Sequence, residues 1–140
     1  MTVYLDTSVI IALIAEEPAS EAIRNWFRNA TDRMIVSDLV RLEFAAFVSR
    51  AVRTKRFDAH QAGLALRRFD QLRKSCDTLE HTPRVFSRAE ELIRDFSMKL
   101  AAADALHLAS ALDTDLSLLT LDTRLQEAAK SNAVGAIVVR

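Results

Sequence analysis

Short β-like runs alternate with helical segments along this chain, and this order constrains the fold more than any other feature. The runs occupy residues 3–5, 34–36, 116–121 and 136–139 and are rich in Val, Ile and Leu. Strands that alternate with helices are typical of crossover units, which build a parallel sheet with helices on both faces. We therefore predict an α/β fold with a mostly parallel central sheet flanked by helices.

The helices between these strands are expected to be long, because only two glycines and two prolines interrupt the 140 residues. Helices are predicted at residues 8–15, 18–27, 38–54, 59–74, from about 84, at 103–112 and at 123–130, with a weak further strand at 78–81. Ser37 or Asp38 can cap the long third helix. An all-helical bundle is the alternative, and the compact β-rich runs argue against it.

Composition narrows the class of protein. The length predicts a single domain over residues 1–140. Nineteen basic and nineteen acidic residues give a net charge of zero, which excludes a global basic field for nucleic acid. Cys76 is the only cysteine, so no disulfide framework forms, and this fits a reducing cytoplasm. The longest apolar run, residues 9–15, is far below the roughly 20 residues that span a bilayer, so no membrane association is expected.

Four carboxylates stand in mostly apolar surroundings: Asp6, Glu43, Asp104 and Asp122. Burying an ionised carboxylate is costly unless it is paired or bound to a cation. No Lys or Arg is regularly spaced to neutralise the four. If the fold brings them together, we expect the missing partner to be a metal ion.

The expected topology places these acids at one edge of the sheet. Asp6 and Asp122 each follow a predicted strand, and ligands of open α/β sheets bind beyond the carboxyl ends of the strands. Glu43 lies in the second turn of the helix after the second strand. Asp104 opens the helix that leads into the strand before Asp122. All four side chains can therefore point at one crevice.

Helix capping is the alternative role for Asp6, Asp104 and Asp122. Other residues are available for that task, since hydroxyls stand at residues 7–8 and Thr123 begins a capping-box pattern. Glu43 has no such explanation, because apolar residues cover nearly all sides of its helix.

Clustered carboxylates repel one another, at about 4 kcal/mol for a pair about 4 Å apart in a medium of dielectric about 20. A divalent cation converts that repulsion into binding, and an all-oxygen ligand set favours Mg²⁺ or Mn²⁺ over Zn²⁺. Phosphodiester hydrolysis is the chemistry that such a site performs best.

The motifs around these acids are specific in their order and spacing, at residues 5–8, 42–43, 103–109 and 119–125. With them, the chain resembles the PIN-domain family over nearly its full length, and most closely the VapC-type toxin ribonucleases. The resemblance implies a PIN-like three-layer fold, dependence on Mg²⁺ or Mn²⁺, and cleavage of single-stranded or looped RNA by a metal-activated water that leaves a 5′-phosphate.

The resemblance also implies roles for individual residues. Asp6, Glu43 and Asp104 match the core catalytic acids and metal ligands of the family, and Asp122 matches its more variable fourth acid, which binds metal directly or through water. Ser8 matches a polar residue that orients water or ligands. Thr120 matches a small hydroxyl residue before the last acid. These six residues are the predicted site: Asp6, Ser8, Glu43, Asp104, Thr120 and Asp122.

A cognate antitoxin, which lays a helix into a groove of the toxin, and a homodimer are the partners that the resemblance implies. The rivals are a non-catalytic Mg²⁺-binding signalling module, a structure-specific DNA nuclease and a purely structural interaction domain. A receiver-like signalling module would carry adjacent acids after its first strand and a late Lys, and neither is present.

Several polar residues have open or ordinary interpretations. Arg124 is expected either to contact substrate phosphate or to pair with an acid. His107 is interpreted as a core or interface histidine rather than a catalytic one. A basic cluster at the end of the third helix is interpreted as a solvated helix end rather than a phosphate site: Arg50, Arg53, Lys55 and Arg56.

Overall fold

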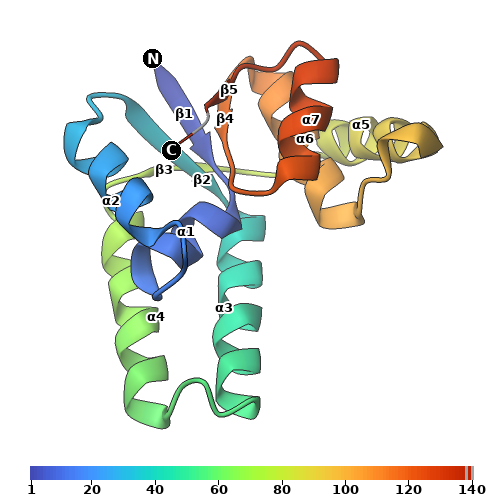
Figure 1. Ribbon diagram of the computed structural model, residues 1–140. Coiled ribbons are helices and arrows are strands. Elements are labelled where there is room, and N and C mark those ends of the chain that lie inside the picture. Colours follow the sequence, from blue (N-terminus) through green and yellow to red (C-terminus); the bar gives the residue numbers. More distant parts are fainter. Residues whose placement is uncertain (138, 140) are drawn as a thin grey trace.

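The computed structural model describes residues 1–137 and 139, which form a five-stranded sheet covered by helices (Figure 1). The strands are β1 (Thr2–Leu5), β2 (Arg33–Ser37), β3 (Asp77–Leu79), β4 (Ser117–Leu119) and β5 (Ala136–Ile137). The helices are α1 (Thr7–Ile14), α2 (Ser20–Asn29), α3 (Asp38–Arg53), α4 (Ala59–Arg73), α5 (Pro83–Arg94), the 3₁₀ helix η1 (Phe96–Met98), α6 (Ala102–Thr114) and α7 (Thr123–Ser131).

The sheet is parallel throughout, in the strand order β3-β2-β1-β4-β5. Tyr4 at the centre of the sheet lies opposite Ile35 on β2 and Leu118 on β4. The chain first builds outward from β1 to β2 and β3, and then crosses to the other side for β4 and β5. The topological switch point therefore lies between β1 and β4, where ligands of such sheets bind.

Two apolar cores lie on opposite faces of the sheet, because successive strand residues point to opposite sides. Val3 and Leu5 belong to the core with α1, α2, α3 and α4. Tyr4, between them, belongs to the core with α5, α6 and α7. The same alternation separates Leu118 from Leu119 on β4. These layers of helix, sheet and helix confirm the predicted α/β architecture.

The helices α3 and α4 run side by side and project together beyond the sheet (Figure 1). Aromatic packing joins them, with the ring centroids of Phe44 and Phe69 separated by 4.6 Å. Phe44 is fully buried, so the first half of α3, which carries Glu43, is anchored in the core. The chain contains no helix, in the part that the structure describes, that is long and apolar enough to cross a membrane.

The predicted element bounds are close to those observed, with three differences. The strand predicted over residues 116–121 spans only Ser117–Leu119, because Thr120 already turns its hydroxyl toward Asp6. The 3₁₀ helix η1 was not predicted. The strand predicted over residues 136–139 is observed at Ala136–Ile137, and residue 138 lies outside the described residues.

The capping assignments require correction. Asp6 and Asp122 are themselves the N-caps of α1 and α7, and Thr123 is already inside its helix. Each carboxylate stands on extended backbone at a strand-to-helix turn, so its oxygen reaches the first free backbone N–H groups. Asp104 caps nothing, since the N-cap of α6 is Ala101 and Asp104 lies in the first turn.

Candidate active site

Asp6 stands at the carboxyl end of β1 and is only 4% exposed. Its Oδ1 accepts hydrogen bonds from Ser8 Oγ at 2.5 Å and from the backbone N of Val9 at 3.3 Å, and its Oδ2 accepts one from Thr120 Oγ1 at 2.5 Å. Burial raises the pKa of Asp6 above its ordinary value, while His107 and these hydroxyl donors oppose that rise. The carboxylate is thus held rigidly.

Two hydroxyls tie the first acid to the last one. Thr120 Oγ1, which donates to Asp6, also accepts from the backbone N of Asp122 at 3.1 Å. Ser8 Oγ, the other donor, accepts from the backbone N of Leu121 at 3.0 Å. The loop after β4 is therefore fastened to the end of β1. These contacts explain why hydroxyl residues stand at positions 8 and 120.

Glu43 projects from the second turn of α3, and its side chain is 31% exposed. Its Oε1 accepts hydrogen bonds from Thr7 Oγ1 at 2.7 Å and from His107 Nε2 at 2.6 Å. Burial alone would raise the pKa of Glu43, but the hydrogen bond and charge of His107 and the Thr7 hydroxyl outweigh it and lower the pKa. Glu43 therefore has a protein partner that the sequence did not indicate, because the paired histidine belongs to a helix far away in the sequence.

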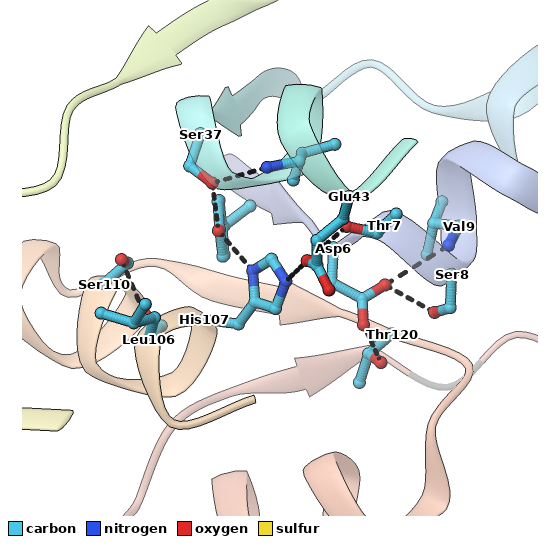
Figure 2. Close-up of polar contacts among 12 residues, drawn as sticks. Asp6, Thr7, Ser8, Val9, Ser37, Glu43, Leu106, His107, Ser110 and Thr120 are labelled. Carbon is cyan, nitrogen blue, oxygen red and sulfur yellow. Dashed lines mark hydrogen bonds and ion pairs between the residues drawn. The ribbon is translucent and has the colours of Figure 1, made fainter. Parts of the chain in front are cut away.

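His107 joins Glu43 to a buried polar chain (Figure 2). Its Nδ1 lies 2.6 Å from Tyr4 Oη, which donates to Ser37 Oγ at 2.8 Å. Ser37 in turn caps α3 by accepting from the backbone N of Val40 at 3.4 Å. Tyr4 and Ser37 are fully buried, and burial raises the pKa of Tyr4 well above its usual range, so the phenol remains neutral.

The six predicted site residues did not include His107, Tyr4 or Thr7, which the structure places in this cluster. The available signals were positional: Tyr4 and Thr7 flank Asp6 on either side of it, and His107 lies one helical turn after Asp104. His107 is indeed a buried histidine, as interpreted, but its ring faces Glu43 rather than apolar side chains alone.

Asp104, in the first turn of α6, and Asp122, the N-cap of α7, are the other two predicted acids. Burial, followed by the negative charge of Asp122, raises the pKa of Asp104, and Asp6 and Glu43 raise it further. The other three predicted acids are therefore close enough to Asp104 to act on it electrostatically. Asp122 also accepts the N–H groups of two residues of α7, Arg124 at 2.8 Å and Leu125 at 3.2 Å.

A surface hollow adjoins the outer two acids. It is lined by Lys99, Ala101, Asp104, Leu121, Asp122, Thr123 and Arg124. A second hollow shares Lys99 and Arg124 with the first and continues along η1 and α7. The two basic side chains therefore lie beside the outer two acids.

The donor set suits a hard divalent cation. Within the described residues, Asp6, Asp104 and Asp122 form no ion pair with Lys or Arg, and their oxygens are ligands that Mg²⁺ and Mn²⁺ prefer. Such an ion would relieve the crowded negative charge around Asp104. Among residues 1–137 and 139, however, no three His, Cys, Asp or Glu side chains are close enough together to hold a metal ion as they stand.

The basic cluster at the end of α3 lies at the opposite end of that helix from Glu43. One of its members, Arg56, pairs with Glu17 at 3.1 Å and lies over the ring of Phe47, 5.5 Å from the centroid. This residue is therefore engaged in holding the loop between α3 and α4 against the body of the protein.

Comparisons with known proteins place these features in a family. The PIN domain family model matches residues 3–131. Ribonuclease VapC46 of Mycobacterium tuberculosis is 37% identical over 139 residues, covering 96% of this chain and 95% of the relative. Ribonuclease VapC35 of the same species is 28% identical over 151 residues, with 96% and 95% covered.

Solved structures share the fold. FitAB bound to the IR36 DNA fragment superposes with a TM-score of 0.74 at 20% identity, covering 96% of this chain and 93% of that chain. Mycobacterium tuberculosis VapC20, described as a sarcin-ricin loop cleaving toxin, gives 0.71 at 18% identity, with 90% and 94% covered. Together with the family match over most of its length, these similarities show that the chain belongs to the PIN-domain family.

Proposed function

We propose that this protein is a Mg²⁺- or Mn²⁺-dependent endoribonuclease and the toxin of a toxin–antitoxin pair. The observation that carries the proposal is that Asp6 and Asp122 follow the paired strands β1 and β4 at the switch point of the sheet, with Asp6, Glu43 and Asp122 all near enough to raise the pKa of Asp104. The names of its relatives support the substrate class, since VapC46 and VapC35 are ribonucleases and VapC20 cleaves the sarcin-ricin loop.

Asp6, Glu43 and Asp104 are the residues that would hold the cation, with Asp122 completing the site directly or through water. Once bound, a divalent cation supplies activation of water and stabilisation of the negative charge that develops on the phosphodiester. The contribution of the chain is orientation. Asp6 is held at both oxygens, and Glu43 is held at one, so these hydrogen bonds restrict the orientations that the two carboxylates can adopt.

Lys99 and Arg124 are our candidates for contact with the RNA backbone. Both are exposed, both line the hollow beside Asp104 and Asp122, and neither forms an ion pair within the described residues. Phosphate contacts of this kind position a nucleic acid without reading its sequence. They offset the repulsion that a polyanion meets at an acidic site.

The antitoxin, a homodimer and a cytoplasmic location belong to the same proposal. Solved neighbours include VapBC2 from Rickettsia felis bound to a DNA fragment from its promoter, and a toxin-antitoxin complex from Klebsiella pneumoniae. Leu42, the residue before Glu43, is 70% exposed and lines a groove between α3 and α4 with Leu66 and Phe69. An apolar face of an antitoxin helix in that groove would lie next to the acidic site.

The test is cleavage of a panel of structured RNAs by the purified protein with Mg²⁺, with Mn²⁺ or with EDTA. We expect cleavage that requires the divalent cation and leaves 5′-phosphate ends. Asp6→Asn, which keeps the shape of the side chain, should abolish it, whereas Glu21→Ala, at an exposed position of α2, should not. Cleavage that persists in EDTA or in Asp6→Asn, or no cleavage of any RNA, would refute the proposal.

A further inference from the structure

The two carboxylate oxygens of Glu43 differ in the hydrogen bonds that they accept. Oε1 accepts from both Thr7 Oγ1 and His107 Nε2, which occupies the two lone pairs of a carboxylate oxygen. No described residue donates a hydrogen bond to Oε2. Thr7 directly follows Asp6, so the contact with Thr7 also brings the carboxyl groups of Glu43 and Asp6 into neighbouring positions (Figure 2).

His107 donates to Glu43 in a fixed direction because a second hydrogen bond, on the other side of its ring, holds the imidazole in place. The ring is 2% exposed, and its Nδ1 is held by Tyr4 Oη at 2.6 Å. Tyr4 is held by Ser37, which caps the helix that carries Glu43. The polar chain thus runs from Ser37, at the end of β2 and the start of α3, through Tyr4 on β1 and His107 on α6 to Glu43 on α3. Rotation of the imidazole would break two hydrogen bonds inside the protein.

We propose that His107, clamped by Tyr4, is a positioning residue that turns Oε1 of Glu43 into the protein and leaves Oε2 to bind the divalent cation. This inference rests on the proposed metal-dependent function. It adds that the affinity for the cation depends on residues that never touch it. A histidine with a purely structural role would stabilise the fold without affecting that affinity.

The test compares three variants of the full-length protein by calorimetric titration with Mn²⁺ alone. His107→Leu removes the donor, His107→Gln retains an amide N–H at a similar reach, and Tyr4→Phe removes only the clamp. His60→Leu is the matched control, because His60 is exposed on α4. Urea unfolding without metal and cleavage at saturating Mn²⁺ complete the set.

We expect His107→Leu to weaken Mn²⁺ binding by about 10- to 100-fold, the usual effect of removing a partner of a metal ligand. His107→Gln should recover most of the affinity, Tyr4→Phe should lose part of it, and His60→Leu should match the wild type. The KM for RNA at saturating Mn²⁺ should change little, because His107, Tyr4 and Ser37 are buried and not exposed to a substrate.

Wild-type Mn²⁺ affinity in a folded His107→Leu protein would overturn the inference, as would equal losses in His107→Gln and His107→Leu. If His107→Leu does not fold, Tyr4→Phe decides, since removing one hydroxyl leaves the shape of the core intact, and unchanged affinity in that variant is refuting. These outcomes differ from failure of the proposed function, in which the wild type itself binds no Mn²⁺.

Discussion

Asp122 has two separable tasks, and substitution there gives the sharpest test of the geometry. Its side chain accepts the backbone N–H groups of Arg124 and Leu125 at 2.8 and 3.2 Å and so caps α7. Its charge also adds to the field around Asp104. Asp122→Ala removes both the cap and the charge, whereas Asp122→Asn removes the charge and keeps an acceptor.

The structure sets the expected magnitudes. Losing an N-cap costs about 1 kcal/mol, so Asp122→Ala should lower the melting temperature by roughly 3–5 °C in a chain of this size. Asp122→Asn loses about 0.3–1 kcal/mol of helix-dipole interaction. It also removes the negative charge that raises the pKa of Asp104, which offsets part of that loss. The metal-free stability of Asp122→Asn should therefore stay within about 0.5 kcal/mol of the wild type.

The assay pairs urea unfolding in EDTA with RNA cleavage in Mn²⁺. We expect both variants to lose cleavage, but only Asp122→Ala to lose stability. Full cleavage by Asp122→Asn would show that the residue is a cap and nothing more. Unchanged stability of Asp122→Ala would refute the capping geometry itself, and with it the reasoning from the two N–H contacts.

Two other substitutions test the remaining acids and their support. Asp104→Asn should abolish cleavage and leave metal-free stability at pH 7 unchanged or higher. The pKa of Asp104 is raised in the folded protein, so its ionised form opposes folding. The gain in unfolding free energy of Asp104→Asn over the wild type should therefore disappear as the pH falls below about 4, where the wild-type carboxyl is protonated in both states. A strongly destabilised Asp104→Asn would show that Asp104 is structural. Thr120→Val should cost about 1–3 kcal/mol in urea unfolding, because it leaves buried Asp6 Oδ2 without its donor, whereas Thr120→Ser keeps the hydroxyl and should cost less.

The fold was predictable because its signals are local. The β-like runs and the capping residue Ser37 each act on their own segment, and each has its predicted effect in the structure. The parallel order follows from the alternation of strands and helices, and the family resemblance is confirmed by the match over residues 3–131. The short η1 had no comparable local signal.

The acids themselves were also predictable from sequence, although their catalytic and metal-binding roles stay a prediction. What sequence could not give was the partner of Glu43. A histidine 64 positions away is invisible to any spacing rule, since only tertiary packing brings α3 and α6 together. The caps at Asp6 and Asp122 were wrongly assigned to neighbouring hydroxyls for a related reason, because the exact turn at which each helix begins depends on where the preceding strand stops pairing.

The parallel topology also determines when the site can exist during synthesis. Asp6 leaves the ribosome early, but the donor to its Oδ2, Thr120, and the neighbour of Glu43, His107, come from the last third of the chain. The contact between Thr120 and Asp6 must await the addition of β4 beside β1, and the contact between His107 and Glu43 must await the packing of α6. Nascent or truncated chains that end before α6 therefore lack the assembled carboxylate cluster. The proposed active site is complete only after α6 and β4 have been added to the fold.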